Sequence, residues 1–235
     1  MTRTAPARRR TTARTASPRS VLVTGAKVVV AGVAVLGVTL LIGLLLVHVL
    51  TYGSVGHLDD AIERSLAGHR TSTLNTLTYA GTQLAQPHTV EVALAALVVV
   101  LALVTRRIRP PLFLAVTVIG ESAIYFAAST LVPRDRPHVP RLGIGDPHAS
   151  FPSGHVAAAI AFYGGCAVLA AHTASPRLLR AITVVIAVVV PPLVGFCRMY
   201  RGFHHLSDIL VGALLGGTWL LITTRLLLLR QVDRP

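Results

Sequence analysis

Six apolar runs, each close to the thickness of a lipid bilayer, constrain this chain more than any other feature. A helix of about 20 apolar residues crosses the hydrocarbon core of a membrane. Only 13% of the residues are charged, whereas a soluble domain has about 25%. The sequence therefore predicts an all-α fold, a bundle of six transmembrane helices. The runs cover residues 28–47, 88–105, 111–132, 156–173, 181–198 and 208–229.

Basic residues are distributed unevenly between the segments that join these runs. With the N-terminus in the cytoplasm, the inner segments carry 15 basic residues and one acid, Asp233. The outer segments carry seven basic residues and seven acids. Because cytoplasmic loops of membrane proteins carry an excess of Lys and Arg, this asymmetry predicts that both termini are cytoplasmic.

The chain divides into a short tail and one membrane domain. Residues 1–24 are rich in Arg, Thr, Ser and Pro and contain no acid, so we expect a disordered basic cytoplasmic tail. Residues 25–232 form the membrane domain. Its outer segment 53–87 has apolar residues at near-helical spacing, which fits either an amphipathic helix on the membrane surface or a packed connector.

Composition also bears on the classes of partner. The net charge of +13 raises the question of nucleic acid, but the arginines are scattered between apolar runs, so we expect no nucleic-acid partner. Cys166 and Cys197 form no CxxC pair, so neither a disulfide framework nor a zinc site is indicated. Glu121 lies near the middle of the third run, where a carboxylate is costly and indicates either function or internal polar packing.

Three polar clusters stand at the outer ends of the predicted spans. Residues 134–137 follow the third span, residues 151–155 open the fourth, and residues 197–208 join the fifth to the sixth. The ends of spans three and five and the starts of spans four and six must share one side of the membrane. Residues distant in sequence can therefore converge there.

The residue types in these clusters suit the chemistry of a phosphate ester or anhydride. Arg136 and Arg198 offer planar pairs of donors that stay charged at any relevant pH. Ser153 and Gly154 stand just before a predicted helix, where free backbone N–H groups and the helix dipole favour an anion. We therefore expect these four residues to bind phosphate.

Two histidines and an aspartate supply candidates for the catalytic groups. His204 and Asp208 are four residues apart and share a face if the segment is helical. Asp208 is then placed to accept a proton from one imidazole nitrogen, which leaves the other as nucleophile. His155 is the candidate acid for the leaving group, a contribution of roughly 10²–10⁴-fold. Because the arginines supply positive charge, we expect neither a metal nor a cofactor.

These residues resemble the motifs of the type 2 phosphatidic acid phosphatase family, which includes bacterial undecaprenyl diphosphate phosphatases and has an active site similar to that of vanadium haloperoxidases. The family pattern is Lys-x6-Arg-Pro, then Pro-Ser-Gly-His, then Ser-Arg-x5-His-x3-Asp. The resemblance covers residues 85–225. The matching residues are Arg136-Pro137, Pro152-Ser153-Gly154-His155 and Arg198-x5-His204-x3-Asp208.

The resemblance implies an integral-membrane enzyme that hydrolyses a lipid phosphate or polyprenyl diphosphate at the extracytoplasmic face through a phosphohistidine, without a metal. Its partners are then the phosphorylated lipid and the surrounding membrane lipids, and a polyprenyl diphosphate would place it in cell-wall synthesis. Two alternatives share the motifs. One is a phosphotransferase that passes the phosphoryl group to a sugar or lipid alcohol, and the other is a catalytically weakened lipid-binding member.

The chain departs from the family pattern at two positions. Ser129 stands where the family has Lys, and Cys197 stands where it has Ser. One phosphate-binding cation is therefore missing from its usual place. Arg134, two residues before Arg136, is the candidate to supply that charge from the same outer rim.

Overall fold

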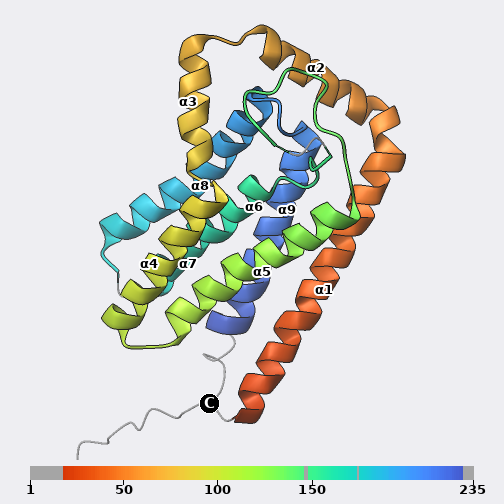
Figure 1. The fold of residues 1–235 in the computed structure, drawn as a ribbon. Helices are drawn as coiled ribbons and strands as arrows, with labels where there is room; N and C mark the ends of the chain where they lie inside the picture. Colours follow the sequence, from red (N-terminus) through yellow and green to blue (C-terminus); the bar gives the residue numbers. More distant parts are fainter. Residues whose placement is uncertain (1–17, 146–147, 174, 230–235) are drawn as a thin grey trace, which may run out of the picture.

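The computed structural model describes residues 18–145, 148–173 and 175–229, and its fold is a bundle of helices (Figure 1). Six of its helical stretches are long and apolar enough to cross a membrane, which confirms the predicted six-span, all-α architecture. The elements are α1 (Pro18–His48), η1 (Leu50–Tyr52), α2 (Ser54–Gly68), α3 (Ser72–Gln83), α4 (Pro87–Thr105), α5 (Arg109–Leu131), α6 (Gly154–Ala159), η2 (Ile160–Gly164), α7 (Gly165–His172), α8 (Arg177–Tyr200), α9 (Leu206–Thr223) and η3 (Thr224–Leu229).

The spans are longer than the apolar runs alone indicate. Helix α1 begins at Pro18, so residues 18–24, which were expected in the tail, belong to the first helix, because the apolar and small residues 21–26 extend it. Residues 1–17 lie outside the described part of the chain. The fourth span combines α6, α7 and the π-helical turn η2 into one stretch, Gly154–His172.

Small residues hold the central helices together. The Trp219 ring of α9 packs against Gly32 of α1 and Gly120 of α5, and its Nε1 donates to the Thr117 carbonyl at 2.9 Å. Two turns earlier on α9, a Cβ at Gly212 would come within 2.5 Å of the Ser153 carbonyl oxygen. Such close backbone contacts are typical of membrane helices. They fix α9 against the start of α6, where two of the motifs meet.

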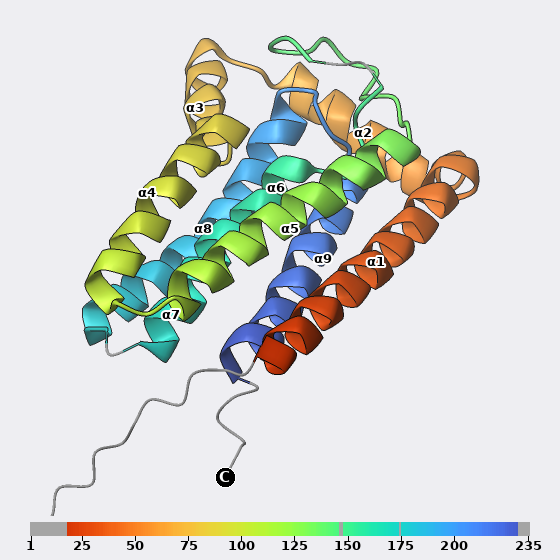
Figure 2. The same cartoon turned by 60° about the horizontal axis from the view of Figure 1, so that its bottom comes forward.

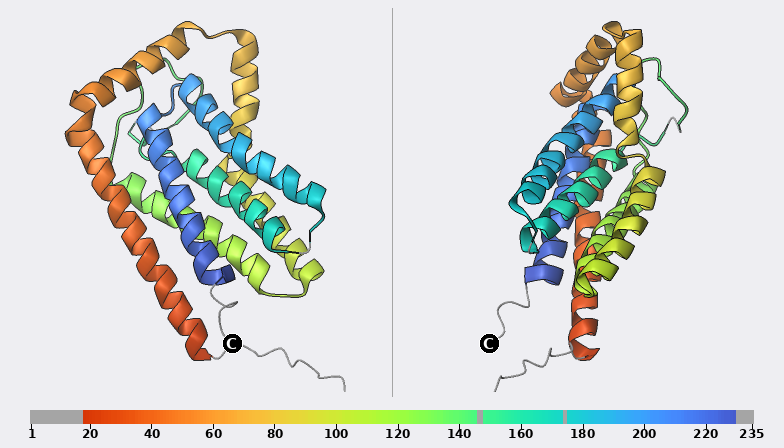
Figure 3. Two further views of the ribbon diagram at one scale, coloured as in Figure 1. Left: turned by 180° about the vertical axis from the view of Figure 1, so that it is seen from behind. Right: turned by 90° about the vertical axis from the view of Figure 1, so that its left-hand side faces the viewer.

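One end of the bundle is covered by α2 and by the loop that joins α5 to α6 (Figures 1 and 3). Helix α2 is a packed connector with an unusual buried face, because it turns Asp59 and Glu63 inward with exposed fractions of 2% and 3%. Leu58 of the same helix is 54% exposed. The start of α1 and the end of η3 lie together at the opposite end of the bundle (Figure 2).

Candidate active site

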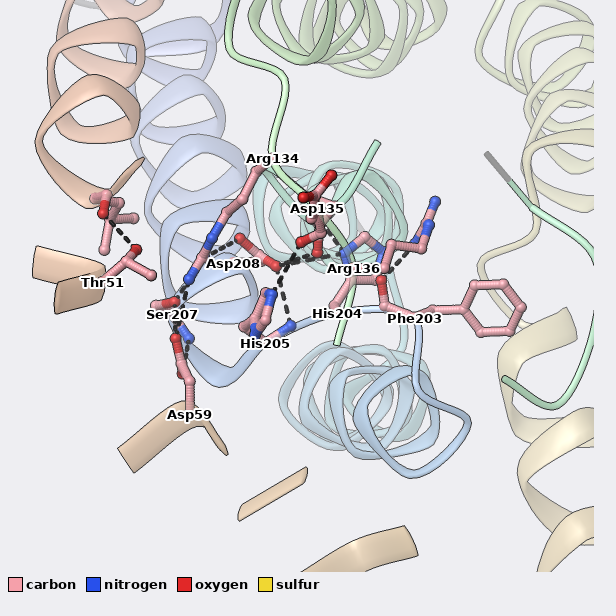
Figure 4. Close-up of polar contacts among 12 residues, drawn as sticks. Thr51, Asp59, Arg134, Asp135, Arg136, Phe203, His204, His205, Ser207 and Asp208 are labelled. Carbon is pink, nitrogen blue, oxygen red and sulfur yellow. Dashed lines mark hydrogen bonds and ion pairs between the residues drawn. The ribbon is translucent and has the colours of Figure 1, made fainter. Parts of the chain in front are cut away.

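The three polar motifs meet at the covered end of the bundle. Helices α5 and α8 end there, and α6 and α9 begin there, as the parity of the spans requires (Figures 1 and 2). The close-up in Figure 4 shows residues 134–136 beside residues 203–205, 207 and 208. Residues more than 60 positions apart in the sequence are hydrogen-bonded there, among them Arg134 and Ser207 at 2.8 Å.

His204 is buried and is held by a backbone carbonyl. Its Nδ1 lies 2.6 Å from the carbonyl oxygen of Ser150. A carbonyl oxygen only accepts, so Nδ1 carries the hydrogen, and in the neutral ring Nε2 keeps its lone pair. Asp208 Oδ2 is 4.0 Å from the same Nδ1. The expected direct hydrogen bond from His204 to Asp208 is therefore replaced by one to Ser150.

Asp208 is linked to His204 by hydrogen bonds through Ser150. It is fully buried at the start of α9. Its Oδ2 accepts from Ser150 Oγ at 2.6 Å and from the His205 backbone N–H at 2.9 Å, and its Oδ1 accepts from Arg134 Nη1 at 2.5 Å. A carboxylate with three donors is fixed in orientation. Asp208 thus fixes the residue whose carbonyl orients the His204 ring.

The surroundings of His204 keep its ring neutral. Burial, together with the positive charges of Arg198 and Arg136, holds the pKa of His204 well below its ordinary value of 6.5. Burial disfavours the charged form of any base, and neighbouring cations act in the same direction. A neutral imidazole with a free Nε2 lone pair is the form that can act as a nucleophile.

Two arginines are stacked on one aromatic ring. The Cζ atom of Arg198 lies 4.2 Å from the centre of the Phe203 ring, and that of Arg136 lies 5.2 Å from it. Arg136 Nη1 also donates to the Phe203 carbonyl. Cation–π contacts of this kind orient guanidinium groups without neutralising them. In the described part of the chain, the buried Nε of Arg198 has no hydrogen-bond partner, so a donor is left for an anion.

Ser153 and Gly154 begin the fourth span as expected. Ser153 is fully buried, and among the residues that the structure describes its Oγ has no hydrogen-bond partner. Its backbone N–H is already used, since it donates to the Asp208 carbonyl at 3.1 Å. A Cβ at Gly154 would come within 2.7 Å of the Tyr125 ring. The hydroxyl of Ser153 and the free N–H groups of the first helical turn are the donors left for a phosphate.

His155 follows directly and contacts a residue that the motifs did not indicate. Its Nε2 lies 3.0 Å from Oε1 of Gln86, which stands between α3 and α4. Gln86 directly precedes the proline that opens α4, a position that sequence alone marks only as a helix start. The contact holds the His155 ring at the edge of the site.

A family model described as the PAP2 superfamily matches residues 84–231. The chain belongs to the PAP2 superfamily. Two solved structures are similar in fold. The phosphatidylglycerolphosphate phosphatase of PAP2 type from Bacillus subtilis has a TM-score of 0.72 at 20% sequence identity. The match covers 86% of this chain and 97% of the Bacillus subtilis chain. LpxE from Aquifex aeolicus has a TM-score of 0.52 at 22% sequence identity, and the match covers 70% of this chain and 93% of the LpxE chain. Comparison with curated proteins by sequence gives no match.

The two departures from the PAP2 pattern have different structural settings. The Oγ of Ser129 donates to the Phe126 carbonyl of its own helix at 3.0 Å. Cys197 is buried in the contact between α8 and α3, where a Cβ at Gly81 would come within 2.6 Å of its Sγ. Cysteine at this PAP2 position therefore has a packing role, whereas serine at 129 leaves its position without a cation.

Arg134 does not take the place of the missing PAP2 lysine. Its guanidinium is buried between two carboxylates, with Nη1 bonded to Asp208 and Nη2 bonded to Asp59 Oδ2 at 3.1 Å (Figure 4). Both nitrogens are thus engaged with acids. The expectation that Arg134 binds phosphate is corrected, because the inward face of α2 presents a carboxylate that the sequence pattern did not reveal.

Proposed function

We propose that this PAP2 protein is a metal-independent phosphatase that hydrolyses a lipid phosphate or polyprenyl diphosphate through a phosphohistidine. The observation that carries the proposal is the setting of His204. Its Nδ1–H is held by the Ser150 carbonyl, and Arg136 and Arg198 are near enough to lower its pKa. This leaves a neutral Nε2 beside two cations that can bind the oxygens of a phosphoryl group.

The proposed reaction has two steps. First, Nε2 of His204 attacks phosphorus, the bond from phosphorus to the leaving oxygen breaks, and His155 donates a proton to that oxygen. Second, water attacks phosphorus and gives a proton to His155 while the phosphorus–nitrogen bond breaks. The products are the dephosphorylated lipid and inorganic phosphate. Arg136, Arg198 and Ser153 stabilise the charge on the phosphoryl oxygens in both steps.

We place the site on the extracytoplasmic side of the cell membrane. The charge asymmetry of the loops supports cytoplasmic termini, and the site lies at the end of the bundle opposite to the start of α1 and the end of η3 (Figure 2). A lipid substrate is supported by the six spans and by the similarity in fold to the Bacillus subtilis phosphatidylglycerolphosphate phosphatase. An external site also suits recycling of a polyprenyl diphosphate carrier, the substrate that we favour.

Purified protein in detergent tests the proposal. Phosphate release is measured side by side with undecaprenyl diphosphate, phosphatidic acid and phosphatidylglycerol phosphate, with and without an acceptor alcohol. We expect release by the wild type and none by His204→Ala, with unchanged thermal unfolding. His172→Ala is the matched control, because His172 also bonds a backbone carbonyl through Nδ1 but is exposed at the other end of the fourth span. Full activity of His204→Ala would contradict the proposal, and phosphate appearing on the acceptor would indicate a phosphotransferase.

A further inference from the structure

Asp59 of α2 is a buried carboxylate bonded to the support of the active site. Its Oδ2 accepts from Ser207 Oγ at 2.5 Å and from Arg134 Nη2 at 3.1 Å, and its Oδ1 accepts from the Ser207 backbone N–H at 3.1 Å (Figure 4). Asp59 is separated from Ser207 by 148 positions. It also lies outside residues 84–231, the part of the chain that the family model matches.

Arg134 connects Asp59 to Asp208. All three side chains are buried: the exposed fraction is 2% for Asp59, 6% for Arg134 and 0% for Asp208. A single guanidinium is thus shared by two acids, and each acid sets how the guanidinium faces the other. Buried ionic groups depend strongly on every partner, because removing one leaves an uncompensated charge.

The contacts continue from Asp208 to the nucleophile. Asp208 Oδ2 accepts from Ser150 Oγ at 2.6 Å, and the Ser150 carbonyl accepts from His204 Nδ1 at 2.6 Å. Without Asp59, the guanidinium of Arg134 is free to turn both of its nitrogens toward Asp208. That carboxylate then rotates away from Ser150, and the carbonyl that orients His204 loses its support.

We propose that Asp59 is a positioning residue for the phosphatase reaction, acting on His204 through Arg134, Asp208 and Ser150. The inference rests on the proposed function of His204. It gives α2 a role in the active site in addition to connecting the first two spans. Glu63, one helical turn further along α2, pairs with His205 Nδ1 and supports the same loop from the next position.

The experiment compares Asp59→Asn with Asp60→Asn in phosphate release from the best of the three lipids. Asp60 is the matched control, since it is the adjacent acid and forms an ion pair with the exposed Arg64 at 3.5 Å. We expect kcat of Asp59→Asn to fall roughly 10- to 100-fold, the loss that a small misplacement of a reacting group causes. We expect KM to stay nearly unchanged, because the phosphate-binding arginines are not altered. Wild-type kcat in folded Asp59→Asn would overturn the proposal.

A double variant separates positioning from a purely structural role. Ser150→Ala removes the hydroxyl that links Ser150 to Asp208 but keeps the carbonyl that holds His204. If Asp59 acts through this link, Asp59→Asn/Ser150→Ala has the kcat of the worse single variant, since contacting residues in one network are not additive. Multiplied losses would overturn the path. If Asp59→Asn fails to fold, Ser207→Ala loosens the same bond to Asp59 without altering charge, and wild-type kcat there would equally contradict the proposal.

His204→Ala in the same series distinguishes the two proposals. If that variant is inactive and Asp59→Asn matches the wild type, only the role of Asp59 is wrong. If His204→Ala is active, the proposed function itself fails, whatever Asp59→Asn does.

Discussion

His204 donates its Nδ1 hydrogen to the carbonyl oxygen of Ser150 at 2.6 Å, so a peptide group rather than a carboxylate orients the ring. A carbonyl dipole stabilises an imidazolium less than a full negative charge does. The bond to Ser150 raises the pKa of the ring, but burial and the nearby arginines outweigh it and keep the resting ring neutral. Asp208 Oδ2 is 4.0 Å from the same Nδ1 and is linked to the ring through its hydrogen bond with Ser150 Oγ.

The lowered pKa of His204 predicts activity in mild acid. A lowered pKa means that the neutral form persists as the pH falls past 6.5, the ordinary value for histidine. The nucleophile of the free enzyme is then lost only at a pH well below 6.5, where the ring finally takes up a proton. We expect the acid limb of kcat/KM against pH to lie below that value.

Arg136→Gln supplies the check on this explanation. Removing one positive charge raises the pKa of His204, so the acid limb moves to higher pH while the maximal kcat/KM falls. An acid limb near 6.5 in the wild type, or one that Arg136→Gln leaves in place, would show that another group controls it.

Phe203 predicts a second measurable effect. Its ring makes cation–π contacts with Arg198 and Arg136, and each such contact contributes about 0.5–2 kcal/mol of interaction free energy. We expect Phe203→Leu to lower kcat/KM by about tenfold, which corresponds to 1.4 kcal/mol, mainly through a higher KM. Tyr79→Leu is the control, because the Tyr79 ring makes the same kind of contact with Arg201, whose Cζ lies 5.4 Å from the ring centre, but outside the phosphate site. Equal losses in both variants would count against a specific role for Phe203.

The sequence predicted the groups that lie in local motifs. Six apolar runs defined the spans. Because successive spans cross the membrane in alternating directions, the number of spans before a residue tells which end of the bundle it occupies, and this placed Arg136, Arg198, His155 and His204 at one end. Parity does not say how a helix is rotated about its axis. The inward turn of Asp59 on α2 is such a rotation, and it decided the role of Arg134.

Side-chain partners at long range were also beyond the sequence pattern. Gln86 contacts His155 across 69 positions and Ser150 contacts His204 across 54. Neither residue type at those positions is unusual for a helix start or a loop. The close approach of Gly212 in α9 to Ser153, three residues after Ser150, lies beside the second pair.

Metal independence is a third prediction. Arg136 and Arg198 supply two fixed positive charges, which is the electrostatic contribution that a divalent cation would otherwise make. We expect phosphate release to continue at the wild-type rate after dialysis against excess chelator. Loss of activity that magnesium or zinc restores would contradict the mechanism, and a chelator-treated His204→Ala sample sets the background.

The missing PAP2 lysine leads to the last prediction. Ser129 lies one helical turn beyond Tyr125, whose ring packs against Gly154 at the phosphate site, so the two side chains share a face of α5. A lysine at 129 can extend its ammonium group along that face toward the site. We expect Ser129→Lys to lower KM by about tenfold, the factor for one charged hydrogen bond of about 1.5 kcal/mol.

Thr130→Lys is the control for this prediction, since Thr130 is exposed on the neighbouring face and its hydroxyl donates to the same Phe126 carbonyl. An equal gain from Thr130→Lys would attribute the effect to general attraction of an anionic lipid, and no gain from Ser129→Lys would mean that two arginines already saturate the phosphate.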